Sequence, residues 1–137
     1  MSMFVKAGAL CPIFIHATQA QDNPVENVIS NQIQALRSEN FDLAFQFSSP
    51  AIQRRILNSS NFVRMIREAF PILMTAKQVE FVKERMRLPL AWQVVRLSGE
   101  QGESYSFAYE MILIGSEWRI NGVLPLEQHG QDAQTPK

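Results

Sequence analysis

The chain has 137 residues, of which 46% are hydrophobic and 19% are charged, and its formal net charge is zero. This length and composition are those of one globular domain that can bury a core of useful size. The balanced charge argues against a protein that binds nucleic acid over its whole surface, because such proteins carry an excess of positive charge.

The N-terminal segment has the three-part form of a secretory signal peptide. Lys6 precedes the apolar run AGALCPIFIHA, and the small residues Thr18 and Ala20 stand third and first before a cleavage point. We therefore predict a signal peptide over residues 1–20, cleavage after Ala20, a periplasmic or secreted product and no membrane insertion after cleavage. The alternative is a short buried helix or strand, because the run is shorter than the roughly 20 apolar residues that span a bilayer.

The single cysteine, Cys11, lies inside this N-terminal segment. A chain cleaved after Ala20 would keep no cysteine, which excludes disulfides and thiol chemistry and suits an oxidising compartment.

The next segment begins with a strong helix start. Asn23 suits a helix cap and Pro24 suits the first helical position. Apolar residues then recur at helical spacing as far as Leu36, and Gln32 is the one polar interruption of this stripe.

Shorter helices are predicted after this one. Residues 40–49 suit a two-turn helix, and Ser49 followed by proline predicts a new start. Residues 59–70 place their apolar side chains on one face, and Pro71 ends that pattern.

After residue 77 the hydrophobic period changes from 3.6 to 2, which indicates strands. The predicted strands are 78–87, 90–98, 103–114 and 117–126, with turn sequences GEQG and GS between the later ones. Helices followed by an antiparallel meander predict one α+β domain over residues 21–126, with N-terminal helices packed on a four-stranded sheet. Residues 127–137 have the composition of a disordered tail.

Alternation along the last two strands predicts which side chains face the helices. In the third strand one face carries Tyr105, Phe107, Tyr109, Met111 and Leu113. In the stretch WRING, Trp118 and Ile120 should point inward, Arg119 and Asn121 outward, and Gly122 suits a bulge.

Three segments together resemble a bacterial family, the domain of unknown function 4864: VISNQIQALRSENFDLAFQFSSPAIQRR, NFVRMIREAFPIL and YEMILIGSEWRINGV. The resemblance covers roughly residues 25 to 126. It implies the cone-shaped, cystatin-like architecture of the nuclear transport factor 2-like superfamily, in which helices close one side of a strongly curved antiparallel sheet. It implies no activity, because that fold carries isomerases, cyclases and binding modules alike.

Metal and cofactor chemistry has no sequence basis in this chain. His129, in the predicted tail, is the only histidine after the predicted signal peptide, and a zinc site needs several ligands at defined spacing. Phosphate loops, dinucleotide fingerprints and nucleophile elbows are missing as well. We therefore predict no cofactor and no metal.

The inner face of the predicted sheet supplies the candidates for a ligand cavity, which are Tyr105, Phe107, Tyr109 and Trp118. An isomerase-type site would also need a carboxylate in this cavity. Glu110 is out of phase with the tyrosines, and Asp42 suits a helix start. Glu80 and Glu84 face inward only if their apolar neighbours do not.

No catalytic residue is assigned on this basis. The prediction is a small exported module that binds a ligand or a protein without catalysis. The alternative is an isomerase or cyclase that acts on a small apolar substrate in the cone cavity.

Residues 51–98 hold nine Lys or Arg against three Glu. Such a basic region could attract an anionic ligand. Lys83, Arg85 and Arg87 alternate on one face of the first strand, where the alternative is loose pairing with Glu100, Glu103 or Glu117.

The second and third strands carry apolar residues on both faces. Such a sheet is expected to be covered on its outer face, and the resemblance points the same way, so we predict a homodimer formed through that face. The residues assigned to the contact are Ala91, Val95, Leu97, Ile112 and Ile114.

Overall fold

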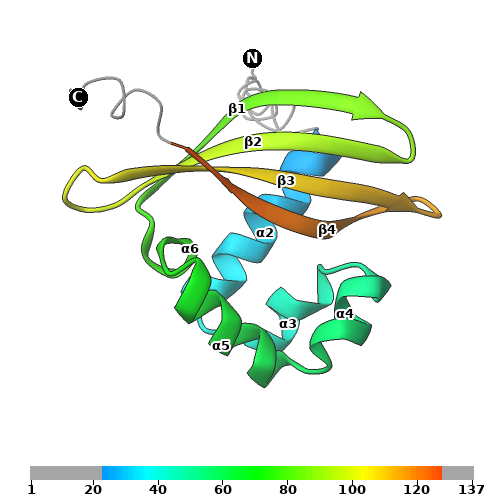
Figure 1. Cartoon of the computed structure of the whole chain (residues 1–137), viewed down its shortest axis with the longest axis horizontal. Coiled ribbons are helices and arrows are strands. Elements are labelled where there is room, and N and C mark those ends of the chain that lie inside the picture. Colours follow the sequence, from blue (N-terminus) through cyan, green and yellow to red (C-terminus); the bar gives the residue numbers. More distant parts are fainter. Residues whose placement is uncertain (1–22, 128–137) are drawn as a thin grey trace, which may run out of the picture.

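A computed structural model describes residues 23–127, in which five helices precede four strands (Figure 1). The helices are α2 (Pro24–Arg37), α3 (Phe41–Gln46), α4 (Pro50–Ile56), α5 (Ser59–Ala69) and α6 (Ile72–Thr75). The strands are β1 (Gln78–Arg87), β2 (Leu90–Ser98), β3 (Ser104–Ile114) and β4 (Glu117–Leu126). The predicted signal peptide, and the predicted tail after Glu127 with His129, lie outside the described residues.

The helix starts follow the predicted capping. The Asn23 side chain accepts a hydrogen bond from the backbone N–H of Glu26 at 3.0 Å, and Pro24 opens α2. Ser49 Oγ accepts from the N–H of Ile52 at 3.2 Å, and Pro50 opens α4. These side chains satisfy N–H groups that the first helical turn leaves without partners.

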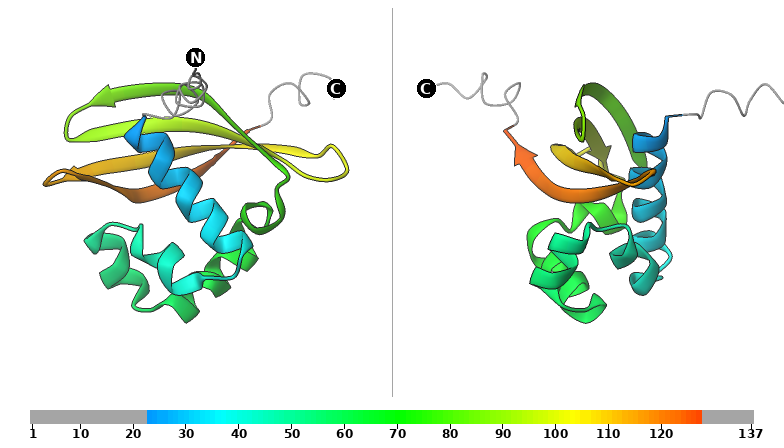
Figure 2. Two further views of the ribbon diagram at one scale, coloured as in Figure 1. Left: turned by 180° about the vertical axis from the view of Figure 1, so that it is seen from behind. Right: turned by 90° about the vertical axis from the view of Figure 1, so that its right-hand side faces the viewer.

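The strands pair in the order β1-β2-β3-β4, each antiparallel to its neighbour. The turns use glycine where the backbone needs a positive φ, at Gly102 before β3 and at Gly115 before β4. The sheet curls over α2, and the shorter helices lie beyond the β4 side (Figure 2). The chain is therefore an α+β domain with helices on one face of a curved four-stranded sheet.

The core lies between α2 and the concave face of the sheet. One face of α2 is almost completely buried through Val25, Ile29, Ile33 and Leu36. From the sheet, Phe107, Tyr109, Met111, Trp118 and Ile120 join the same cluster, as their alternation predicted. Complete burial of side chains of this kind stabilises a fold by about 1.5–3 kcal/mol each.

The faces of β2 are opposite to the prediction. Ala91, Val95 and Leu97 were assigned to the outer contact, but each is 0% exposed in the core. The register explains this result, because it sets Val95 opposite Phe107 of β3, and side chains of directly opposed residues share one face. The outer face of β2 instead carries the half-buried Trp92 and Val94.

Strand β4 is tied to the helices along its free edge. The N–H of Ser49 donates to the carbonyl of Ile120 at 2.8 Å, and the N–H of Ile120 donates to the carbonyl of Phe47 at 2.8 Å. A one-residue bulge at Asn121 lies next to Gly122, where the glycine predicted it. These bonds hold the start of α4 against β4, and the shorter helices lie on the β4 side of the sheet (Figure 1).

Among the helices of residues 23–127, none is long and apolar enough to span a bilayer.

Candidate functional site

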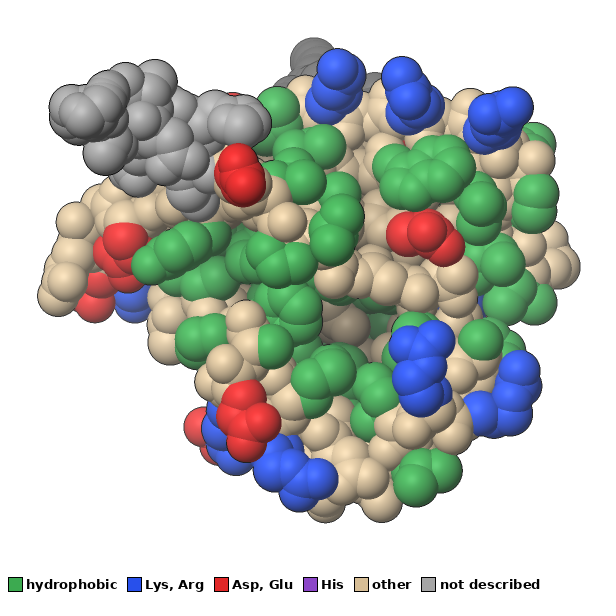
Figure 3. Space-filling model, viewed as in Figure 1, with side chains coloured by type: hydrophobic (Ala, Val, Ile, Leu, Met, Phe, Trp, Pro, Cys, Tyr) green, Lys and Arg blue, Asp and Glu red, His purple; other side chains and the backbone are tan. Residues whose placement is uncertain are grey.

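A cavity of about 320 Å³ lies between β4 and the helices α4 and α5. It opens on the surface as a hollow below the sheet, with hydrophobic side chains around it (Figure 3). Its apolar lining is Ile52, Ile56, Phe62, Met65, Ile66, Phe70, Leu73, Ile120 and Val123. A concave apolar site of this size with a few polar groups is the usual form of a small-molecule site.

Helical and strand periodicity together produce this lining. Phe62, Met65 and Ile66 recur at the spacing that places side chains on one face of α5. In β4, Ile120 and Val123 both face the helices because the bulge at Asn121 adds one residue between them. The cavity therefore depends on the same hydrophobic pattern that builds the core.

Gln32 and Ser48 are the buried polar residues of the cavity wall, and Gln32 is the one with an unpartnered side-chain atom among the described residues. Gln32 is 3% exposed, and its side-chain oxygen Oε1 is buried without a hydrogen-bond partner among the described residues. A buried acceptor left unpaired costs about 1–3 kcal/mol. It was not among the predicted site residues, although its position as the one polar interruption of an apolar stripe marked it.

Arg55 is the charged residue that lines the same cavity, and its side chain is exposed. No ion pair or hydrogen bond of its guanidinium is present within residues 23–127. No sequence pattern marked this position, apart from the overall basic character of residues 51–98. Only the packing of α4 beside β4 brings Arg55 to the cavity.

Asn121 connects the cavity wall to the neighbouring strand β3. Its Oδ1 accepts from Ser49 Oγ at 2.7 Å, and its Nδ2 donates to Glu110 Oε2 at 2.8 Å. Asn121 was predicted to point outward, but it lines the cavity. In the folded chain its side chain links α4, β4 and β3.

The four predicted cavity candidates do not line the cavity of about 320 Å³ between β4, α4 and α5, which is called the central cavity below. The fold places them at three other positions. Tyr109 is 0% exposed in the core, opposite Gln93 of β2, and its hydroxyl has no partner in the described part of the chain. Burial raises the pKa of Tyr109 well above its ordinary value, because the phenolate would be desolvated.

Tyr105 and Phe107 line a second hollow, of about 410 Å³, beside α6 and the end of β4. Phe107 is buried and packs edge-on against Phe70, with ring centroids 5.7 Å apart. Tyr105 is 45% exposed at the rim. Phe107 therefore belongs to the core, whereas Tyr105 lies at the surface.

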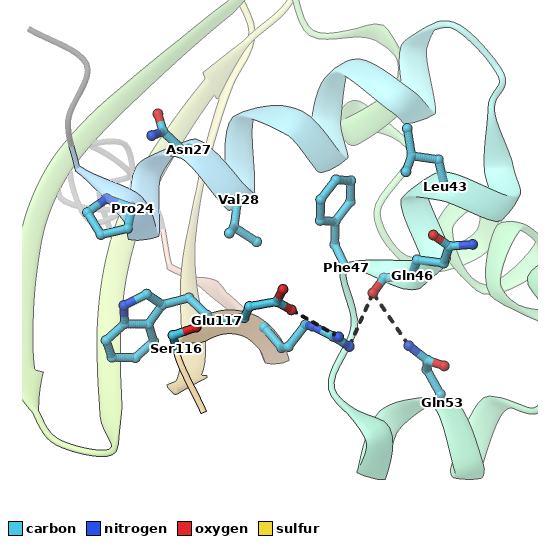
Figure 4. A pocket seen from close by; sticks show the side chains of 11 residues that line it. Pro24, Asn27, Val28, Leu43, Gln46, Phe47, Gln53, Ser116 and Glu117 are labelled. Atoms are coloured by element: carbon cyan, nitrogen blue, oxygen red, sulfur yellow. Dashed lines mark hydrogen bonds and ion pairs between the residues drawn. The ribbon is translucent and has the colours of Figure 1, made fainter. Parts of the chain in front are cut away.

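Trp118 lines a third hollow, of about 680 Å³, between the first turns of α2, the end of α3 and the β3–β4 turn (Figure 4). The two charged groups of this hollow, Arg119 and Glu117, already bind each other. Arg119 donates to the carbonyl of Ser48 at 3.3 Å and pairs with Glu117 at 3.3 Å. Although this hollow is larger, none of the buried polar atoms that lack a partner among the described residues lines it, whereas Gln32 Oε1 belongs to the lining of the central cavity.

The carboxylates considered for acid–base chemistry lie outside the lining of the central cavity. Glu80 is exposed and pairs with Arg96 at 2.7 Å, and Glu84 is exposed and accepts from Asn23 Nδ2 at 3.0 Å. Asp42 accepts from Ser59 Oγ at the surface, and Glu110 binds Asn121.

The three basic residues of β1 lie together on the outer face. A bulge at Val82 shifts the register so that Lys83 and Arg85 stand opposite Val94 and Trp92 of β2. Lys and Arg side chains follow this edge of the sheet in Figure 3. The ion pairs within residues 23–127 are Arg96–Glu80 and Arg119–Glu117. The three basic residues are solvent-exposed, as the alternative expected, but they do not pair with Glu100, Glu103 or Glu117.

Within the described range, no group of three or more His, Cys, Asp or Glu side chains is arranged to hold a metal ion.

Comparison with protein families gives one match. Residues 18–133 match the model of a family described as domain of unknown function (DUF4864). Neither a curated protein nor a solved structure matches the chain.

Proposed function

The chain belongs to the DUF4864 family, and we propose that it is a non-catalytic module that holds a small, mainly apolar molecule in its central cavity. The observation that carries the proposal is the combination of an apolar lining with one buried, unpartnered acceptor, Gln32 Oε1. A site of this composition presents both apolar surface and an unpartnered polar group, and a ligand of matching chemistry contacts both.

Binding is favoured over catalysis by the composition of the lining. Isomerase-type chemistry needs a carboxylate beside the substrate to move a proton. The lining residues include one charged side chain, the cationic Arg55, and the other polar side chains are Gln32, Ser48 and Asn121. These groups can orient a ligand, but none is a general base at neutral pH.

Export is a further part of the proposal. It is supported by the sequence pattern before Gln21, which consists of Lys6, an apolar run and the small residues Thr18 and Ala20. We therefore propose that the module acts in the periplasm or outside the cell.

A thermal-shift titration with octanol tests ligand binding. Octanol is uncharged and mainly apolar, so it measures the cavity without help from Arg55. At ten times its Kd it should stabilise the native state by about 1.4 kcal/mol, which raises the melting temperature by about 5 °C in a domain of this size.

Two methionine variants make the test specific to the cavity. Met65→Trp fills the cavity and should abolish the octanol shift, because Met65 is part of the lining. Met86→Trp changes an exposed residue of β1 that is not part of the lining and should keep the shift. Equal shifts in both variants, or no shift in the unmodified protein, would refute the proposed function.

A further inference from the structure

The geometry points to a ligand with two different ends: an amphipathic organic anion, whose carboxylate binds Arg55 and whose far end carries a hydroxyl that binds Gln32. This inference rests on the proposed function and specifies the chemical class that the central cavity takes.

The inner end is defined by Gln32. The residue comes from the buried face of α2, and its Oε1 lacks a partner among residues 23–127. A group that donates a hydrogen bond is needed there. A hydroxyl fits best among common groups, because it donates to a carboxamide oxygen and also accepts from a carboxamide nitrogen.

The outer end is defined by Arg55. Its guanidinium is exposed to solvent, lines the cavity and has no acidic partner in the described part of the chain. A guanidinium binds a carboxylate through two parallel hydrogen bonds, a geometry that a neutral group does not offer.

One carboxylate, that of Glu110, is hydrogen-bonded to a residue of the cavity wall. Glu110 accepts a hydrogen bond from Asn121 Nδ2 at 2.8 Å, but Glu110 itself is not part of the lining. The charge that faces the cavity is therefore positive, which favours an anion over a cation.

The body of the ligand is defined by the walls between these two ends. The lining is aliphatic and aromatic, with side chains such as Ile66 and Phe62 from α5. The volume of about 320 Å³ lies at the lower end of the roughly 300–1,000 Å³ that small-molecule sites occupy. An unbranched chain of about eight carbons with a polar group at each end has a comparable size.

Four probes with the same carbon chain separate the contributions of the two ends. They are octanol, octanoate, octanediol and ω-hydroxyoctanoate, each titrated into the protein while amide chemical shifts are followed by NMR. We expect ω-hydroxyoctanoate to bind most tightly. Its advantage over octanoate should be about fivefold, which is one net hydrogen bond to a buried group.

Two variants assign these contributions to residues. Arg55→Gln should lower the affinity for octanoate about three- to tenfold and leave the affinity for octanol unchanged. Arg54→Gln is the matched control, because the neighbouring arginine is also exposed on α4 but is not part of the lining. Gln32→Met keeps the side-chain length and should remove the advantage of ω-hydroxyoctanoate over octanoate.

The outcomes separate this inference from the proposed function. If octanol binds but octanoate and ω-hydroxyoctanoate bind no better, or if Arg55→Gln and Arg54→Gln behave alike, the inference is wrong and the proposed function stands. If octanol does not bind, the proposed function is wrong, and the inference that rests on it is wrong as well. Shifts confined to the outer sheet face would also overturn the inference, because they place the anion on the β1 residues instead.

Discussion

At the scale of single residues, buried polar groups distinguish this core from a purely apolar one. Gln32 Oε1, Gln93 Oε1 and the Tyr109 hydroxyl are buried without partners among the described residues. Most buried polar atoms in folded proteins are paired, so each such atom calls for an explanation. For Gln32 the explanation proposed above is a ligand, because Gln32 lines the cavity, whereas Gln93 and Tyr109 do not.

Tyr109 provides a prediction with a defined pH dependence. Its folded-state pKa is raised by burial above an unfolded value near 10. The stability that it contributes is therefore complete below about pH 10 and is lost as the pH rises further. Tyr109→Phe removes an unpartnered hydroxyl and should leave stability at pH 8 unchanged or increase it by about 1 kcal/mol.

Between pH 8 and pH 11 the unmodified protein should lose about 1.4 kcal/mol more stability than Tyr109→Phe, as measured by urea unfolding. Tyr105→Phe is the matched control, because Tyr105 is 45% exposed and the protein has two tyrosines in all. If Tyr109→Phe and the unmodified protein lose the same stability between pH 8 and pH 11, Tyr109 ionises as readily in the native state as in the unfolded state, and the prediction is wrong.

At the scale of elements, the outer faces of β2 and β3 carry apolar side chains that no other part of residues 23–127 covers completely. With Val95 in the core, the outer face presents the half-buried Trp92, Val94, Ala108 and Ile112, and Leu124 of β4 is 61% exposed beside them. A face of this kind is typically covered in the working protein. Self-association through this face, with residues corrected by the register, remains our proposal.

The corrected prediction is that Val94→Glu and Ile112→Lys each convert a dimer into a monomer, since each places an unpaired charge in the contact. Sedimentation velocity at micromolar concentration measures this directly. Leu43→Lys is the control, because it adds a charge at an exposed position of α3, on the helical side of the sheet and not on its outer face (Figure 1). A single monomer peak for the unmodified protein would contradict the proposal.

At the scale of the whole molecule, the described domain and the segment before it are expected to separate in the cell. The proposed signal peptide ends at Ala20, shortly before the Asn23 cap of α2, so cleavage would leave the first helix intact. Mass spectrometry of protein purified from its native host should find a chain that begins at Gln21. An intact N-terminus in the cytoplasmic fraction would contradict export.

The sequence by itself determined the elements and their order. Capping residues such as Asn23 and Ser49 marked helix starts, and two-residue alternation marked β1, β2 and β4 at their observed ends. These features are local, because a cap or an alternating strand is read within a few residues. The short helix α6 after Pro71 was missed, since four residues carry too little periodicity to be recognised.

Only the tertiary structure decided which face of β2 is inside and where the cavity lies. Val94 and Val95 are equally apolar, and the register with β3 alone turns Val95 inward. Gln32 and Arg55 are 23 positions apart in the chain, and packing of α2, α4 and β4 brings both to one cavity. Strand register and helix packing are set by contacts between distant residues, so no local pattern contains them.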